Sequence, residues 1–306
     1  MGILILSSLG TSAAPSTAQK GCTPQKLNPL GVTFEDELDQ SMTTPGGALP
    51  IGAVFFNGTH QLNTTGAQSF IPQKEVLTRV EFLMAKNATA TSPCTCAIRE
   101  NLTGGDLAFD RVNPDQFKVY NPENLTGNMT WVEFNFYSVW VTPGKTYYMV
   151  LFTANMTNNI YWCAGNDTNI YPNGSAFYST NGGYIWQNLT DSDACFKTYG
   201  VRETVLAVTM KKGLIGPSFT IKNIGNYTAG SVASNISING GILGLINISS
   251  VNIHSDLLPG EQIIARTGLI LGFGNIKIIA RFSAINAKEQ LIQFNATVFL
   301  FFWMIK

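Results

Sequence analysis

Charged residues are scarce in this chain. Lys, Arg, Asp and Glu make up 12% of its 306 residues, about half of the share usual in soluble proteins. The 19 basic residues balance the 19 acidic ones, and no long run of either sign occurs. The sequence alone therefore supports neither a nucleic acid nor an anionic membrane as a partner.

Residues that carry catalysis are also few. His60 and His254 are the only histidines, so a histidine triad or metal site would have to join two distant segments. The chain contains no G-x-S-x-G, phosphate-binding loop, dinucleotide-binding or H-E-x-x-H motif. We therefore predict that the protein is not an enzyme, and we expect no cofactor apart from the calcium considered below.

Long apolar runs and helical periodicity are missing as well. The longest apolar run at the C-terminus, residues 298–305, has eight residues, well short of the ~20 of a membrane span. We predict no membrane span. What recurs is alternation with period two between Gly, Asn and Pro residues, which is typical of half-buried antiparallel strands. In residues 75–86, for example, Val80 and Phe82 share one face and Arg79 lies on the other.

A change in composition after Gly200 divides the chain into an aromatic-rich part and a part rich in Ile, Val, Gly and Asn. The second part contains about seven strand patterns in roughly 100 residues, as in an immunoglobulin-like sandwich. The strands are expected at 204–210, 218–224, 233–239, 242–249, 262–269, 275–283 and 291–303. We predict an all-β protein of two β-sandwich domains, at 32–202 and 203–306.

The strongest positive signal is the density of N-x-S/T sequons, the acceptors of N-linked glycans. The composition would produce roughly four by chance, but the chain has fourteen, and a sequon matters only outside the cytoplasm. They begin at Asn57, Asn63, Asn87, Asn101, Asn124, Asn128, Asn155, Asn166, Asn173, Asn188, Asn226, Asn235, Asn247 and Asn295. Glycans would replace charge in keeping the surface soluble.

The N-terminus agrees with export. Residues 3–6 are apolar and residues 11–14 are small, which resembles the end of a signal peptide although no basic residue precedes the apolar run. We assign 1–14 to a signal peptide and 15–31 to a linker or extended arm. The predicted location is secreted, at the cell surface.

Five cysteines are present, so at least one stays unpaired. Cys163 and Cys195 fall on two predicted strands of the same domain, which makes them the first candidates for a disulfide. Cys94 and Cys96 are two residues apart on one strand, where a mutual bond would be strained. Either could instead reach Cys22.

Two further groups carry binding hypotheses. Glu35, Asp36, Glu37 and Asp39 form an acidic cluster that could hold a structural calcium ion or could simply be a solvated turn. Tyr184 and Trp186 follow a predicted exposed turn at 181–183. They could stack on sugar rings, or they could fill the sandwich core.

Residues 37–200 resemble a β-sandwich module of secreted and surface proteins of archaea, especially methanogens. The matching pieces include Ala67-Gln68-Ser69-Phe70-Ile71-Pro72, Trp131-Val132-Glu133-Phe134, Val141-Thr142-Pro143-Gly144-Lys145-Thr146-Tyr147-Tyr148 and Phe196-Lys197-Thr198-Tyr199-Gly200. The resemblance implies a jelly-roll-like sandwich similar to galactose-binding folds, with no catalytic motif to transfer.

Residues 204–285 resemble the immunoglobulin-like or CARDB-like repeats of archaeal surface proteins, on Ile221-Lys222-Asn223-Ile224-Gly225 and Leu258-Pro259-Gly260-Glu261. Such repeats act as spacers and adhesion modules, and a fold-level likeness does not identify a ligand.

The apolar run 298–305 has no polar face. It could be an internal strand covered on both sides, or it could dock against a neighbouring subunit. We therefore expect a structural subunit of a filament, sheath or surface layer that self-associates into a polymer through β-strand contacts. The alternative is an adhesin that binds surface glycans.

Overall fold

The computed structural model describes residues 36–56, 60–121, 123–124, 128–153, 159–213 and 216–305. The predicted signal peptide and arm lie outside these residues. The described chain is all-β, with 21 strands and two single-turn 3-10 helices. Among the described residues, no helix has the length and apolarity that a bilayer crossing requires.

The first sandwich is built from thirteen strands. They are β1 (Glu37–Met42), β2 (Gly47–Phe56), β3 (His60–Phe70), β4 (Val76–Lys86), β5 (Cys94–Arg99), β6 (Asp106–Val112), β7 (Thr130–Trp140), β8 (Tyr147–Thr153), β9 (Ile160–Asn166), β10 (Ala176–Ser179), β11 (Gln187–Leu189), β12 (Asp193–Ala194) and β13 (Phe196–Val201), with the helix η1 (Pro114–Gln116) after β6.

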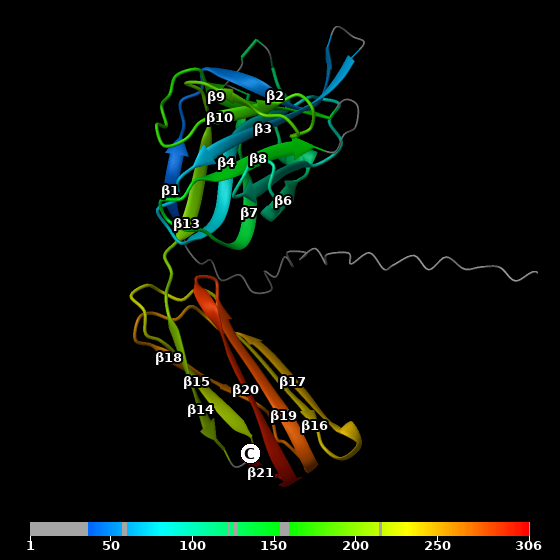
Figure 1. Ribbon diagram of the computed structural model, residues 1–306, viewed down its shortest axis with the longest axis vertical. Helices are drawn as coiled ribbons and strands as arrows, with labels where there is room; N and C mark the ends of the chain where they lie inside the picture. Colours follow the sequence, from blue (N-terminus) through cyan, green and yellow to red (C-terminus); the bar gives the residue numbers. More distant parts are fainter. Residues whose placement is uncertain are drawn as a thin grey trace, which may run out of the picture.

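Nine of these strands form one continuous path that folds over on itself in the order β1-β13-β4-β9-β2-β3-β8-β5-β6. Of the other four, β7 pairs with β4, β12 with β9, and β10 with both β3 and β11. The long strand β3 makes the connection, because its residues 60–64 pair with β2 and its residues 66–70 pair with β8. The sheet thereby becomes the two layers of a jelly-roll-like β-sandwich (Figure 1).

Alternation sets the core of this sandwich, as predicted. Val80 and Phe82 of β4 are buried, and Arg79, which precedes them, lies on the opposite face. On the neighbouring strand β7, Phe134 is buried and its ring meets that of Phe82 edge to face, with centroids 6.4 Å apart. Aromatic pairs of this geometry contribute about 0.5–1.5 kcal/mol beyond the area they bury.

The second sandwich packs a three-stranded sheet on a five-stranded one, in the orders β14-β15-β18 and β17-β16-β19-β20-β21. Its elements are β14 (Leu206–Lys212), β15 (Pro217–Asn223), β16 (Ala233–Gly240), η2 (Ile242–Gly244), β17 (Ile246–Ile253), β18 (Gln262–Arg266), β19 (Gly272–Ala284), β20 (Ala287–Leu300) and β21 (Phe302–Ile305). The rings of Phe219 and Phe282 meet in its core, 5.1 Å apart. The core clusters of the two sandwiches share no residue.

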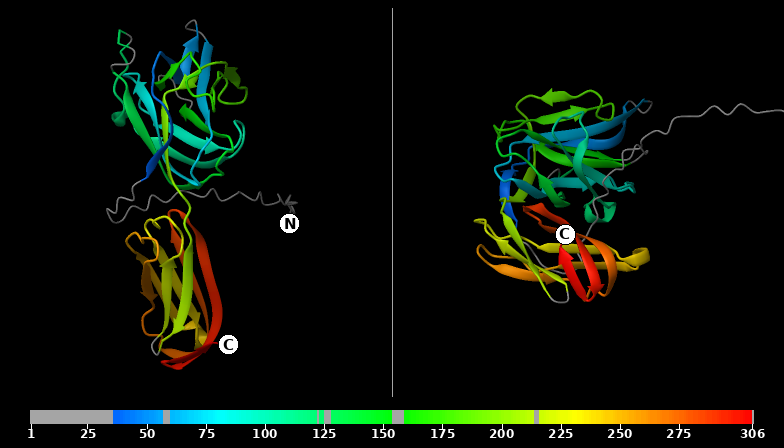
Figure 2. Two further views of the ribbon diagram at one scale, coloured as in Figure 1. Left: turned by 90° about the vertical axis from the view of Figure 1, so that its left-hand side faces the viewer. Right: turned by 60° about the horizontal axis from the view of Figure 1, so that its bottom comes forward.

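The two sandwiches meet end to end, around the β19–β20 turn (Figures 1 and 2). Ser138 of β7 donates a hydrogen bond to the carbonyl oxygen of Ile285 at this turn, at 2.8 Å. The buried side chain of Asn286 donates to the carbonyl oxygens of Arg202 and Thr228. The connecting segment is thereby fixed to the upper end of the second sandwich.

Two predicted strands of the second sandwich are wrong in part. Residues 242–244 form η2 rather than the start of a strand, because Leu243 adopts a positive φ of 58°. The run 298–305 is not one internal strand, since the chain reverses at Leu300, which has φ 60°. Val298 and Trp303 are buried, but the residues of the turn between them are exposed and β21 is an edge strand.

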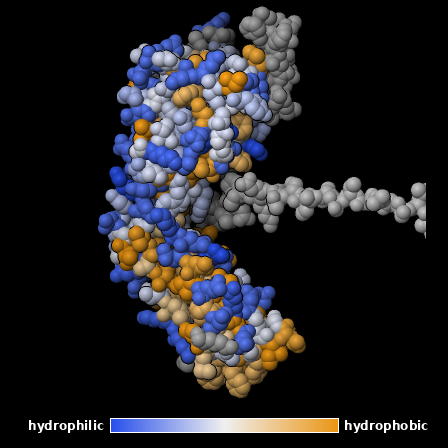
Figure 3. Space-filling view, in the orientation of Figure 1, coloured by the Kyte–Doolittle hydropathy of each residue, from blue (hydrophilic) through white to orange (hydrophobic). Residues whose placement is uncertain are grey.

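These corrections place apolar side chains on the surface. Figure 3 shows apolar residues on the surface of the second sandwich, both at the end that lies away from the first and on the side nearer to it. The end away from the first sandwich carries η2, the β18–β19 connection and the β20–β21 turn (Figure 1).

Candidate functional site

The sequon asparagines are accessible throughout the part of the chain that the structure describes. Asn57 and Asn155 lie outside it. Of the other twelve, nine are exposed and three, Asn63, Asn87 and Asn166, are half-buried. None of the twelve is buried, and they occur on both sandwiches.

Three other asparagines give the contrast. Asn159, Asn223 and Asn286 are all at most 2% exposed, and none of them begins a sequon. Their side chains satisfy buried backbone groups; Asn223, for example, donates to the carbonyl oxygens of Tyr227 and Leu257. Among the described asparagines, therefore, none that begins a sequon is buried.

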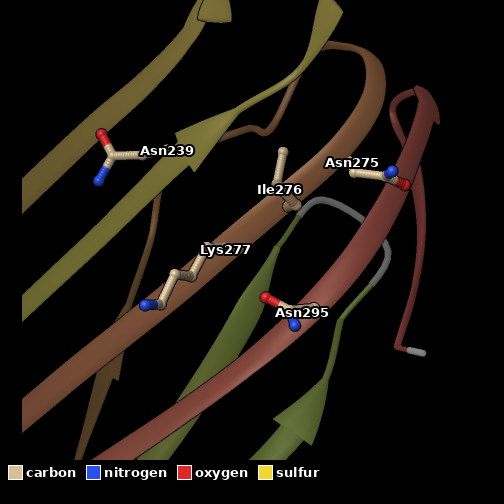
Figure 4. A pocket seen from close by; sticks show the side chains of 5 residues that line it. All are labelled: Asn239, Asn275, Ile276, Lys277 and Asn295. Carbon is tan, nitrogen blue, oxygen red and sulfur yellow. The ribbon is translucent and has the colours of Figure 1, made fainter.

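Three sequons lie on one face of the five-stranded sheet. Asn235, Asn247 and Asn295 alternate with buried or half-buried apolar residues on β16, β17 and β20, so all three point to solvent. Asn295 also borders a shallow hollow on this face, together with Asn239, Asn275, Ile276 and Lys277 (Figure 4). Lys277 pairs with both Asn239 and Asn295 across the sheet, so the hollow is lined by side chains that donate and accept hydrogen bonds.

The two aromatic candidates differ in their environment. The turn after β10 is longer than predicted, and β11 begins at Gln187. Tyr184 in this turn is 84% exposed. Trp186 is half-buried, and its ring lies close to Gly183. Its indole nitrogen is buried and has no hydrogen-bond partner.

The acidic candidates point to different partners. Glu35 lies outside the described residues. Asp36 binds the Arg79 guanidinium at 2.9 Å, and Glu37 binds Lys74 at 2.8 Å. The hydrogen bond from Lys74 lowers the pKa of Glu37.

Asp39 accepts the backbone N–H of Gln73, and burial raises its pKa. The described residues contain no group of three or more His, Cys, Asp or Glu side chains placed to hold a metal ion. Asp36, Glu37 and Asp39 tie β1 to its neighbours, and the calcium site stays a prediction.

The four described cysteines, Cys94, Cys96, Cys163 and Cys195, are buried thiols in the first core. The backbone N–H of Cys195 donates to Ala164, next to Cys163, so these two lie on neighbouring segments. Both are free in the structure, and their disulfide stays a prediction. Desolvation raises the pKa of Cys195 to about 12.

His254 accepts or donates a hydrogen bond with the Ser234 hydroxyl at 3.1 Å, and desolvation lowers its pKa. The side chain of His60 lies outside the described side chains. Asp193 is buried and its carboxylate accepts the backbone N–H groups of Ile170 and Tyr171. These polar groups hold loops and strands together.

No family model matches this chain, and no curated protein matches it either. Solved structures match it at low similarity. A β-glucuronidase of Bacteroides uniformis is 9% identical, with 78% of this chain and 26% of that chain covered and a TM-score of 0.23. A transglutaminase of red sea bream is 8% identical, with 85% and 30% covered and a TM-score of 0.22. The chain thus spans about a third or less of these proteins, and a likeness this low carries no argument about activity.

Proposed function

We propose that this protein is a secreted, N-glycosylated structural subunit of the cell exterior that self-associates through β-strand contacts. The observation that carries the proposal is the accessibility of all twelve described sequon asparagines, set against the three buried asparagines without sequons. A chain with so few charges needs another solvating shell, and accessible glycans supply it. The resemblance to archaeal surface modules supports the same function.

The edges of the five-stranded sheet indicate where strands of neighbouring subunits would pair. An edge strand exposes unpaired backbone groups to other chains. One edge, β17, carries the sequon Asn247, and a glycan there hinders an approaching strand. The other edge, β21, has no sequon and exposes Phe302, Met304 and Ile305. We place the lateral contact at β21.

Electron microscopy and light scattering of the purified glycoprotein test this proposal. The wild-type protein should form polymers at high concentration. Met304→Lys with Ile305→Lys should leave it monomeric, because charged edge strands resist pairing. Val251→Lys on β17 is the matched control and should still polymerise. Dispersed wild-type monomers, or a glycan-free native protein, would contradict the proposal.

The alternative function is a glycan-binding adhesin, which the exposure of Tyr184 favours. Exposed aromatic rings can pack on the C–H faces of sugars. Binding on a glycan array that is lost in Tyr184→Ala and in Trp186→Ala would support it. Failure to bind any sugar would exclude it.

A further inference from the structure

Three connections at the far end of the second sandwich form one surface, which we call the distal tip: residues 241–245, 267–271 and 299–302. The register of β19 with β20 brings Phe273 against Phe299, with ring centroids 5.3 Å apart. The backbone N–H of Gly241 donates to Asn275 at 2.7 Å, which holds the η2 connection against the start of β19. The three connections are therefore fixed side by side on regular strands.

The distal tip presents apolar side chains to solvent. Leu243 and Leu245 are 91% and 80% exposed, and Leu271, Phe299 and Phe301 are exposed as well. These residues lie in or directly beside the connections at the end of the sandwich. Contiguous exposed apolar surface of this kind marks an interaction site.

The charged side chains near the distal tip are all basic. Lys211 of β14 and Arg266 of β18 both pair with Ser218 of β15, so they lie in the last row of the three-stranded sheet next to the tip. Lys212 follows and lies over the ring of Trp303. All three cations are exposed.

The acidic residues of this sandwich are far from the tip. Positions 204–305 contain three, Asp256, Glu261 and Glu289. Asp256 bonds Ser231 before β16, Glu261 precedes β18 and Glu289 is near the start of β20. In each case this is the end that faces the first sandwich. A cationic rim therefore surrounds an apolar tip.

No sequon begins within the three segments of the distal tip. No N-x-S/T motif begins between residues 248 and 294 or after Asn295. Asn247 is the nearest sequon in the sequence, two residues after Leu245. Lys211 and Arg266 lie on the other sheet, β14-β15-β18, whose strands carry no sequon.

A second copy of the chain fits the tip poorly. Contact between two tips would bring six cations together without an acidic group, which opposes association. A head-to-tail contact needs an apolar surface elsewhere. On the described part of the first sandwich, the only exposed large apolar residues adjacent in sequence are Tyr184 and Ile185, followed by the sequon Asn188.

We propose that the distal tip docks on an anionic lipid surface. The apolar side chains of the turns enter the interface between headgroups and acyl chains, and Lys211, Lys212 and Arg266 bind the acidic headgroups. Peripheral proteins use this combination of inserted apolar residues and flanking cations. Docked in this way, the first sandwich points away from the membrane and β21 stays free at the side of the sheet for lateral pairing.

Vesicle flotation of the full glycoprotein tests the proposal. The probes are vesicles of phosphatidylcholine alone and vesicles with roughly one-third phosphatidylglycerol. Wild-type protein should float with the anionic vesicles, and less with the neutral ones. Leu243→Ser with Phe301→Ser should reduce partitioning by about 10-fold or more, because two inserted side chains are lost. Val251→Ser with Ile264→Ser, exposed on the same sandwich away from the tip, should float like wild type.

Two further variants separate the contributions. Lys211→Glu with Arg266→Glu should lose the preference for anionic vesicles. Phe301→Trp should give a blue-shifted fluorescence emission when vesicles are added, since the indole leaves water. Thermal unfolding by circular dichroism confirms that each variant is folded.

Three results would overturn the proposal. The first is wild-type protein that stays with the soluble fraction on anionic vesicles. The second is a folded Leu243→Ser, Phe301→Ser variant that floats as well as wild type. The third is a tip variant that loses self-association in the absence of lipid, which would make a second copy the occupant. The variant Met304→Lys with Ile305→Lys changes the lateral edge β21 and leaves the tip segments unchanged. It therefore distinguishes a failure of self-association from a failure of lipid docking.

Discussion

The indole nitrogen of Trp303 donates a hydrogen bond to the carbonyl oxygen of Gly213, at 3.0 Å. This bond joins β21, at the edge of the five-stranded sheet, to the end of β14 in the facing sheet. Trp303 is 2% exposed, and its ring also meets Phe294. Strand β21 is therefore fixed to the sandwich by one side chain, although its other three residues are exposed.

Trp303→Ala should destabilise the second sandwich by about 3–5 kcal/mol, since the substitution removes a buried ring and leaves a carbonyl without its donor. Chemical denaturation followed by circular dichroism measures the effect. Phe302→Ala, the exposed neighbour, is the control and should change the free energy of unfolding by less than about 1 kcal/mol. Equal effects of the two substitutions would mean that the hairpin is not anchored by Trp303.

Arg79 holds the outer face of the first sandwich. Its guanidinium binds Asp36, Glu81 and Glu133, and it lies 3.4 Å from the centre of the Tyr199 ring. Arg79→Met should destabilise this sandwich by about 2–3 kcal/mol, because half-buried carboxylates lose their partner. Arg79→Lys should recover part of the loss, since a lysine keeps the charge but not the planar fork.

The exposed pair of Lys145 and Glu100 provides the control for Arg79. Both side chains are nearly half-exposed, so Lys145→Met should cost less than about 1 kcal/mol. The denaturation midpoint of the first sandwich measures both substitutions. A loss in Arg79→Met no larger than that in Lys145→Met would contradict a stabilising role for the network.

Alternation and turn chemistry in the sequence predicted most of the strands. The face of β4 with Val80 and Phe82 is buried as expected, and the predicted Pro143-Gly144 turn has Gly144 in the left-handed region at φ 81°. These features are local, because a two-residue period and a glycine each determine their own geometry.

The C-terminal hairpin could not be predicted in the same way. Leu300 adopts a positive φ although no Gly or Asn marks the turn, and an apolar run reads the same whether it is covered or exposed. The closeness of Lys211 and Arg266 could not be predicted either. The two residues are far apart in the sequence, and they come close only because both pair with Ser218 of β15. Pairing between distant strands decides both features.

His254 should make the stability of the second sandwich depend on pH. In the folded state, desolvation lowers the pKa of His254 below its ordinary value of 6.5. The unfolded chain therefore binds more protons at mildly acidic pH. Stability should therefore fall as the pH drops below about 6.5, and the loss should level off below the folded-state pKa. His254→Gln should remove this component of the pH dependence. A wild-type protein equally stable at neutral and mildly acidic pH would contradict the prediction.

Occupancy should differ among the sequons. The side-chain nitrogen of Asn166 donates to the Thr44 carbonyl at 3.0 Å, and that of Asn128 donates to the Val119 carbonyl at 3.2 Å. This nitrogen is the atom that accepts the glycan, so a bond to backbone competes with transfer on a folded chain. Asn173 and Asn226 lie exposed in loops. We expect lower occupancy at Asn128 and Asn166 than at Asn173 and Asn226, measured by mass spectrometry of glycopeptides.

Glycosylation of the denatured chain in vitro is the control for this prediction. Unfolding breaks both hydrogen bonds, so the difference between the two pairs of sites should disappear if folded structure causes it. A difference that persists on the denatured chain would trace occupancy to the local sequence around each sequon. Equal occupancy of all four sites in the native protein would contradict the prediction, since the bonds of Asn166 and Asn128 belong to the folded sandwich.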